Sequence, residues 1–448
     1  MNQFFQAPTP TEQIRQLNTN DNATKQYKSS LLFTEPLSKK FFMEVFYNFS
    51  QTGNDVLRRV KNAETANLTR VDSLSTYFDN AILYNRIGTS VRYAHQGKNV
   101  AIGVAAQQIR LNGQSAIDEG LPYGEPIKPK PFNNIIPYFS TTIEFKNNIY
   151  TNFDYNYNVR EPEIQDLQPV RNVNNQAFIT EGNPNLTPER SHNFNLSLNY
   201  WNPSSFASLG VWSNFDFFDS QIIYNQFTDI LPQGGIRTVS KAENISGGRQ
   251  IGVGFWGNYP IIKTKLTLNG NGNLNFGNNP SFINSIKNET TNNGYSVRLG
   301  LTLTLTEKLI LGVSGNLRNN DIKYSIQSQQ NQKIRNESLE SSIKWNFASK
   351  FFLESNFNYS SFRNDRFDFN QTIPIWNASV RRILGKKDKL EMRLAAFDLL
   401  NRRVNITQTG SQNFVSRNIA ETLARYFMLS VTYNMRGFEN KLKKNNWW

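Results

Sequence analysis

Residues 182–200 read GNPNLTPERSHNFNLSLNY, and the second half of this stretch changes character at every residue. Phe194 and Leu196 alternate with Asn195 and Ser197, which is the period-two pattern of a β-strand with one apolar and one polar face. The first half is rich in turn-forming residues and contains two prolines, which lack the N–H that a sheet interior requires. The stretch therefore predicts a polar connection that leads into an amphipathic strand.

The same alternation recurs along the chain, for example at residues 152–160, 265–276 and 295–305. These segments run about 10–13 residues, which is longer than the usual strand of about 5–6 residues and close to the roughly 9–11 residues of a transmembrane strand. Their polar faces consist mainly of Asn, Ser, Thr, Arg and Gly. We expect the apolar faces to contact lipid and the polar faces to line the inside of a barrel.

The connections between these strands alternate between short and long. Short turns are expected at residues 36–40, 94–99, 146–148, 202–205, 260–263, 306–308, 348–350 and 385–388. Longer polar loops are expected near residues 51–80, 113–133, 161–188, 227–247, 277–293, 319–332, 361–370 and 401–415. Short periplasmic turns and long extracellular loops are typical of outer-membrane barrels, so the pattern predicts an all-β, transmembrane antiparallel β-barrel.

The pattern gives one strand before the first short turn and sixteen after it, about seventeen in all. Residues 1–24 are expected to be the remnant of an extracellular loop, residues 25–435 the strands of the barrel, and residues 436–448 a periplasmic tail. Because single-chain bacterial barrels have an even number of strands, at least one more strand is expected before Met1. The first residues show no signal peptide, which also favours an N-terminally truncated chain.

Composition narrows the class of protein further. The 448 residues are polar on average, with a mean hydropathy of −0.55, yet 13% are aromatic, which argues against disorder. The net charge of +14 is scattered, so we expect outer-membrane lipid and lipopolysaccharide as anionic partners and no nucleic acid. The chain has no cysteine, which excludes a disulfide framework.

Four segments resemble parts of TonB-dependent outer-membrane receptors: GNPNLTPERSHNFNLSLNY, TEPLSKKFFMEVFYNFS (34–50), AAFDLLNRRVNI (395–406) and ARYFMLSVTYNM (424–435). The resemblance covers nearly the whole chain. It implies a 22-stranded barrel, a plug domain in the lumen, and TonB as the partner that supplies energy. The sequence contains no recognisable plug or TonB-binding segment, so we expect the C-terminal barrel portion of such a receptor, with the plug domain absent.

Three arginines, Arg160, Arg298 and Arg318, fall on predicted lumen faces. They are candidates for contact with an anionic ligand or with carboxylates of a plug. The alternative is a charge network that pairs across strands, and we favour it. A lipid-facing position near the midplane would cost each arginine about 2–4 kcal/mol, and a lumen position avoids that cost.

Aromatic residues next to short turns are expected to form a girdle at the membrane interface. This group comprises Tyr200, Trp201, Phe206, Trp345 and Phe347. In the closing strand, Phe427, Leu429, Val431 and Tyr433 are expected to face lipid. This strand is the expected signal for the barrel assembly machinery.

Catalysis has little support in the sequence. The two histidines, His95 and His192, lie far apart and have no suitably spaced partner, so we expect no catalytic residue, metal or cofactor.

The preferred interpretation is a receptor in the bacterial outer membrane that imports a scarce, unknown small ligand: a siderophore, a cobalamin, a glycan or a peptide. It is not expected to be an enzyme. One alternative is a non-transporting outer-membrane barrel that acts as an adhesin or scaffold. A second alternative is a soluble secreted carbohydrate-binding β-protein.

Overall fold

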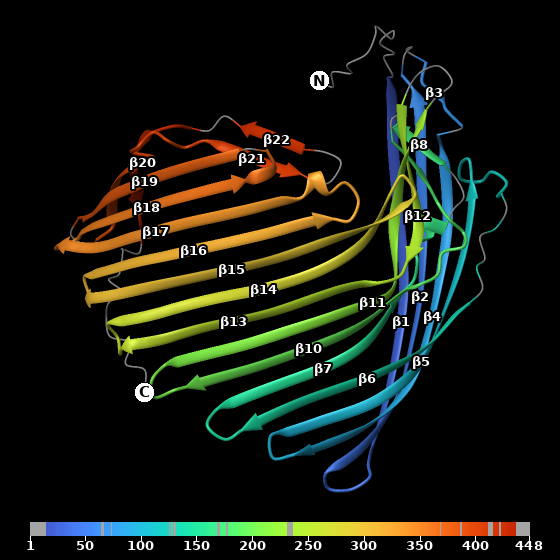
Figure 1. The fold of residues 1–448 in the computed structure, drawn as a ribbon, viewed down its shortest axis with the longest axis horizontal. Coiled ribbons are helices and arrows are strands. Elements are labelled where there is room, and N and C mark those ends of the chain that lie inside the picture. Colours follow the sequence, from blue (N-terminus) through green and yellow to red (C-terminus); the bar gives the residue numbers. More distant parts are fainter. Residues whose placement is uncertain are drawn as a thin grey trace.

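The computed structural model describes residues 15–63, 67–72, 74–124, 126, 129, 131–167, 171–175, 178–230, 236–367, 369–385, 388–410, 415–420 and 423–435. Within these residues the fold is one large antiparallel sheet of 21 strands and a separate hairpin (Figure 1). No described helix is long and apolar enough to cross a membrane.

Four strands of the sheet are additions at the end where the long connections lie, and the remaining seventeen pair in chain order. These seventeen are β1 (Gln16–Pro36), β2 (Phe41–Asn62), β4 (Thr76–His95), β5 (Lys98–Ala116), β6 (Phe132–Phe145), β7 (Ile149–Arg160), β10 (Glu189–Asn202), β11 (Ala207–Ile230), β13 (Gly248–Ile262), β14 (Leu266–Ile283), β15 (Ile286–Thr306), β16 (Leu309–Tyr324), β17 (Gln332–Ala348), β18 (Phe351–Asn364), β19 (Phe369–Leu384), β20 (Leu390–Phe397) and β23 (Tyr426–Tyr433). The all-β fold with about seventeen strands is therefore as the sequence predicts.

The additions are β3 (Thr69–Arg70), β8 (Arg171–Asn175), β9 (Phe178–Glu181) and β12 (Ile236–Ile245). The separate hairpin consists of β21 (Asn405–Gly410) and β22 (Val415–Ala420). Three short helical turns complete the described elements: α1 (Ile164–Leu167), η1 (Ser328–Gln330) and η2 (Asp365–Phe367).

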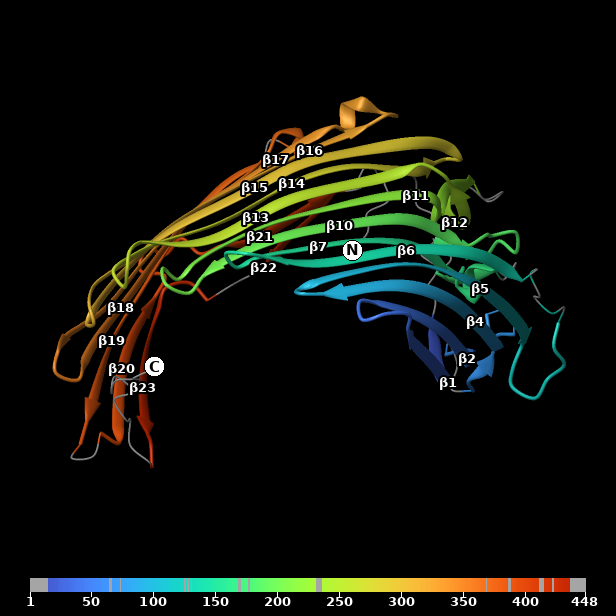
Figure 2. The ribbon, with the colours of Figure 1, turned by 90° about the horizontal axis from the view of Figure 1, so that it is seen from below.

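The sheet curves into an arch with β1 at one foot and β23 at the other (Figure 2). β1 pairs with β2, and β23 pairs with β20. No pairing between β1 and β23 occurs in the described part of the chain. The arch has a convex outer face and a concave inner face, and alternation along each strand decides which side chains lie on which face.

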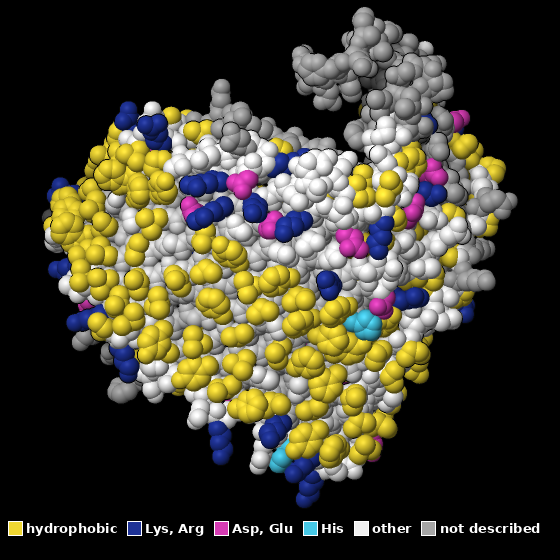
Figure 3. Space-filling view, in the orientation of Figure 1, with side chains coloured by type: hydrophobic (Ala, Val, Ile, Leu, Met, Phe, Trp, Pro, Cys, Tyr) yellow, Lys and Arg dark blue, Asp and Glu magenta, His cyan; other side chains and the backbone are white. Residues whose placement is uncertain are grey.

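Apolar side chains cover the convex face (Figure 3). Leu299, Leu339 and Tyr359 are joined by cross-strand register through Gly315, and they are 53%, 48% and 41% exposed. Soluble monomers rarely expose contiguous apolar patches larger than a few hundred Å². A belt that spans neighbouring strands therefore needs an apolar environment.

The short turns lie where the sequence predicts them, whereas several predicted long loops are strands. Residues 277–283 and 286–293 continue β14 and β15, and the hairpin closes at Asn284 and Ser285 with φ of 47° and 64°. Similarly, β1 begins at Gln16, within the segment 1–24 that was expected to be a loop. The reason is physical: outside lipid both faces of a hairpin meet water, so a polar sequence without alternation still forms a ladder. Residues 1–14 and the predicted tail 436–448 lie outside the described residues.

The buried apolar core lies on the concave side, at the end of the sheet where the long connections lie. Ile109 and Leu111 of β5 are 0% and 2% exposed, and they alternate out of phase with the exposed Ile102 and Val104. They pack against Leu167 and Leu186 of the β7–β10 connection and against Ala242 of β12. The prediction of a purely polar inner face is therefore wrong here, because the β7–β10 connection folds inward and covers these side chains.

Candidate functional site

A hollow of about 700 Å³ lies along strands β13 to β19. Its floor follows one row of register partners, which runs through Asn269, Gly300, Ser314, Glu340 and Asn358. The row alternates with the apolar belt, so it belongs to the concave face. Glycine and serine in the middle of the row leave the space that larger side chains would fill.

One ion pair crosses this hollow. The Arg298 guanidinium donates to the Glu340 carboxylate at 2.6 Å and to the Ser314 hydroxyl at 3.0 Å. Both charged side chains are more than 40% exposed, so the pair adds little to stability. The two opposite charges cancel at this point of the hollow, and the pair places one hydrogen-bond donor and one acceptor at its surface.

Four amide side chains that line the hollow make no hydrogen bond to other described residues. They are Asn269, Asn271, Asn356 and Asn358. Each amide has two N–H donors and one carbonyl acceptor. The hollow thus offers many hydrogen-bonding groups to an occupant and little net charge.

Trp256 forms an aromatic edge of the hollow. Its indole lies over Gly210 of β11, where an added Cβ would be 2.2 Å from the indole Nε1. A side chain at position 210 would displace the ring, so glycine is required for this close approach. The tryptophan is 42% exposed, which leaves part of the ring open to contact.

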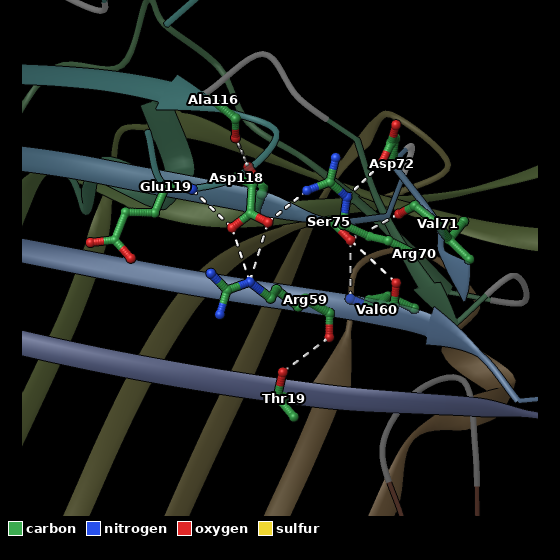
Figure 4. A network of polar contacts seen from close by, with 11 residues as sticks. Thr19, Arg59, Val60, Arg70, Val71, Asp72, Ser75, Ala116, Asp118 and Glu119 are labelled. Atoms are coloured by element: carbon green, nitrogen blue, oxygen red, sulfur yellow. Dashed lines mark hydrogen bonds and ion pairs between the residues drawn. The ribbon is translucent and has the colours of Figure 1, made fainter. Parts of the chain in front are cut away.

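Asp118 joins the β2–β4 and β5–β6 connections (Figure 4). Its carboxylate accepts from Arg59 at 3.0 Å and from Arg70 at 2.6 Å, and its side chain is 14% exposed. Burial alone raises the pKa of Asp118, but the Glu119 backbone N–H and the two guanidiniums outweigh it and lower the pKa below its usual value. Asp118 is therefore charged at neutral pH and acts as the hub of this network.

A second contact fixes the inward-folded β7–β10 connection. The Tyr224 hydroxyl of β11 donates to the Asp166 carboxylate at 2.8 Å. The Asp166 backbone carbonyl also accepts from the Asn183 N–H. The connection is thus held to β11 by a hydrogen bond and to β5 by the apolar core.

The three predicted arginines do not converge on one point. Arg160 pairs with Glu189 across β7 and β10 at 2.5 Å, and Arg298 pairs with Glu340. Arg318 of β16 is exposed, and no ion pair or hydrogen bond of its side chain occurs among the described residues. Their contact with a ligand or plug stays a prediction.

The predicted interface residues lie at strand ends or directly beside them. Tyr200 and Trp201 end β10, Phe206 precedes β11, and the rings of Trp345 and Phe347 in β17 are 5.5 Å apart. In the closing strand, Phe427, Leu429, Val431 and Tyr433 are 66%, 63%, 60% and 63% exposed and alternate along β23. Contact of these groups with lipid also stays a prediction.

The histidines are not part of a metal centre in the described residues, where no cluster of three or more His, Cys, Asp or Glu occurs. His192 contacts the Tyr155 hydroxyl at 2.9 Å and the Asp219 carboxylate at 3.2 Å. The Asp118 network was not predictable from local sequence, because the partners of Asp118 are 48 and 59 residues away.

Comparison with known proteins finds one matching family and several solved structures of similar fold. Residues 1–334 match the model of a family described as the outer membrane protein beta-barrel family. The structure is similar to the copper transporter OprC, at 9% identity and a TM-score of 0.43, with 92% of this chain and 74% of that chain covered. No curated protein matches the sequence.

Two solved receptor structures resemble this structure to a similar degree. The siderophore receptor PiuA from Acinetobacter baumannii is 10% identical, with a TM-score of 0.42 and coverage of 92% of this chain and 64% of that chain. The ferric yersiniabactin uptake receptor FyuA from Yersinia pestis is 10% identical, with a TM-score of 0.39 and coverage of 91% and 61%. The chain thus spans less than two thirds of the length of these two receptors.

Proposed function

This chain belongs to the outer membrane protein beta-barrel family, and on that premise we propose that it forms the wall of a receptor that imports a scarce ligand. The protein is located in the bacterial outer membrane, as its family and its apolar belt require. A soluble secreted protein, the third interpretation of the sequence, does not fit this family.

The observation that carries the proposal is the chemistry of the 700 Å³ hollow. Asn271, Asn356 and Asn358 are exposed and Asn269 is half-buried, so their amides are open to water or to an occupant of the hollow. Here four amides, an indole and an ion pair converge on one open space without closing a network. Such a surface suits a ligand that slides past many weak partners, since uniformly strong binding would stop transport.

Lipid, lipopolysaccharide and the barrel assembly machinery are the partners proposed for the convex face and the closing strand. TonB and a plug domain are proposed from the resemblance to TonB-dependent receptors. With a plug seated on the concave face, proton-motive force would gate access to the hollow.

The test is uptake in a strain that lacks the gene, complemented with the complete coding sequence. Four labelled probes represent the ligand classes: a ferric siderophore, cyanocobalamin, a malto-oligosaccharide and a pentapeptide. We expect one probe to accumulate in the complemented strain and not in the deletion strain, and a protonophore to abolish the difference. Equal uptake of all four probes with and without the gene contradicts import of these ligands.

A second function, adhesion, is favoured by one observation. β11 has 24 residues and therefore reaches about 80 Å when extended, against a hydrocarbon core of about 30 Å. Much of this hairpin must project from the membrane. An adhesin would confer binding of cells to a surface that a protonophore leaves unchanged, and it would leave uptake unaltered.

A further inference from the structure

A second, smaller hollow of about 180 Å³ lies on the other arm of the arch, among strands β2, β4, β6 and β7. Phe46 and Tyr138 form its aromatic sides, with ring centroids 6.5 Å apart. Both rings lie over glycines of neighbouring strands, Gly88 and Gly103, which fixes them against the wall. Arg86 supplies the hollow's charge.

Arg86 has no counter-ion among the described residues, unlike Arg92 of the same strand. Arg92, six residues further along the same face of β4, donates to Glu44 at 2.8 Å. In the described residues, Arg86 makes no ion pair within 4.0 Å and no hydrogen bond, and its guanidinium carbon lies 5.7 Å from the centre of the Phe46 ring. An unneutralised guanidinium on the concave face attracts an anion.

The residues beside Arg86 are donors without acceptors. Register places Arg86, Gln107 and Asn134 side by side across β4, β5 and β6. Gln107 and Asn134 are 5% and 9% exposed, and Gln107 Nε2, Asn134 Nδ2 and Arg86 Nε are all buried with no partner. The Gln107 carbonyl already accepts from the Tyr84 hydroxyl at 3.3 Å.

Gln107 and Asn134 lie beside Arg86 but do not line the hollow itself. Two groups that do line it offer hydrogen bonds: the Tyr138 hydroxyl and the Asn156 amide, which have no partner among the described residues. The hollow therefore combines one positive charge, several N–H and O–H donors and aromatic sides. A cation is excluded by the charge, and a neutral ligand would leave the guanidinium unmatched.

We propose that this hollow binds a carboxylate group. One negative charge balances the single guanidinium, and two oxygens match its paired N–H donors, whereas a phosphate dianion would leave excess negative charge. The carboxylate belongs either to a small organic acid or to a glutamate or aspartate of a polypeptide seated on the concave face. The site stands independently of import, because it rests on the wall alone.

The test is binding to the complete chain in detergent micelles, read by fluorine NMR of fluoroacetate, with fluoroacetamide as the neutral probe of the same size. We expect fluoroacetate to bind and fluoroacetamide not to bind. Arg86→Gln should weaken binding roughly 10- to 100-fold, because a charged hydrogen bond is lost. Tyr138→Phe, which keeps the ring over Gly103, should weaken it about 3- to 10-fold.

The matched control is the double variant Glu44→Gln/Arg92→Gln. It removes an arginine from the same strand and face without changing the net charge, and binding should be unchanged. If Arg86→Gln does not fold, Tyr138→Phe still decides the question. Absence of fluoroacetate binding, or binding that neither single variant changes, overturns the proposal and leaves water as the partner of these donors.

A competition arm separates the two sources of the carboxylate. Acetyl-Gly-Glu-Gly-amide is compared with acetyl-Gly-Gln-Gly-amide as competitors of fluoroacetate. A glutamate peptide that competes at concentrations at least about 10-fold lower than acetate does assigns the site to a polypeptide. Acetate that competes as well as the peptide assigns it to a small acid. Either result supports the proposal when Arg86→Gln removes the competition for fluoroacetate binding.

Discussion

At the scale of single residues, Asp118 shows how one carboxylate organises two connections that are distant in sequence. Arg59 comes from β2, Arg70 comes from β3, and Asp118 itself follows β5. Ser75 adds a neighbouring bridge, since its hydroxyl accepts from the Val60 N–H and donates to the Val71 carbonyl. The β2–β4 and β5–β6 connections are therefore joined by polar contacts.

Replacing this hub should loosen both connections together. We expect Asp118→Asn to lower the free energy of local opening by about 1–2 kcal/mol, since two charged hydrogen bonds weaken at partly exposed partners. Hydrogen exchange of the backbone amides at residues 57–60 and 115–118 measures the change. Asp72→Asn is the control: its side chain is 60% exposed and contacts Arg70 alone within this network, so exchange should change little.

The same hub predicts a pH dependence. The pKa of Asp118 is lower in the folded protein than in an unfolded chain, so folding favours the charged form. Its contribution is complete above the unfolded pKa of about 3.9 and is lost as pH falls through the lower folded value. The difference in exchange between wild type and Asp118→Asn should therefore persist at pH 5 to 7 and close in stronger acid. A difference that does not change with pH would contradict this account.

Sequence reasoning at this scale finds residues but not their partners. Arg298 is recognisable as a polar-face arginine because its own strand alternates, whereas its pairing with Glu340 crosses two strand boundaries. The absence of a counter-ion at Arg86 is harder to predict, because it requires that no carboxylate of a neighbouring strand is a register partner of Arg86.

At the scale of elements, the long hairpins support one another at their tips. The tip of the β14–β15 hairpin contacts β11, where Gln226 and Ile283 form a parallel bridge. Asn225, which is 3% exposed, donates to the Ser285 hydroxyl at 3.1 Å and accepts from the Ser285 N–H at 3.1 Å. It also donates to Glu243 of β12. One buried amide thus joins β11, β12 and the β14–β15 turn.

Removing that amide should free the hairpin tip. We expect Asn225→Ala to cost about 1–3 kcal/mol locally, because the partners at Ser285 and Glu243 are left unsatisfied. Hydrogen exchange at residues 281–288 should accelerate while the membrane-level ladder stays protected. Asn279→Ala is the matched control, since Asn279 lies on the same hairpin but makes one exposed contact, with Gln250. Unchanged exchange at the tip in Asn225→Ala would show that β11 does not support it.

The strands themselves are largely predictable from the sequence, apart from the ends that lead into the long connections. Within the membrane, lipid on one side imposes an alternation that fixes register and the position of each short turn, as at Thr306 and Leu309. Beyond the membrane that constraint disappears, and strand and loop have the same polar composition. For this reason the extension of β14 to Ile283 and the inward fold of the β7–β10 connection were not predictable.

At the scale of the whole molecule, two faces of one sheet meet opposite environments. The row that contains Leu339 runs over the convex face, and the row that contains Ser338, with Asn316 and Ser360 as register partners, runs over the concave face. Adjacent residues of one strand at one depth therefore have opposite surroundings. This arrangement places the apolar belt on the convex face and leaves polar side chains such as Ser338 on the concave face.

A charge placed on each face tests this arrangement directly. We expect Leu339→Arg to destabilise the protein by about 2–4 kcal/mol in lipid vesicles, because the guanidinium meets hydrocarbon, and Ser338→Arg to cost about 0–1 kcal/mol. Unfolding by urea in phosphatidylcholine vesicles measures both variants. The two positions are adjacent in β17, so depth, strand and side chain introduced are matched. Equal costs would mean that the convex face does not contact lipid, and a larger cost at Ser338 would reverse the assignment of inside and outside.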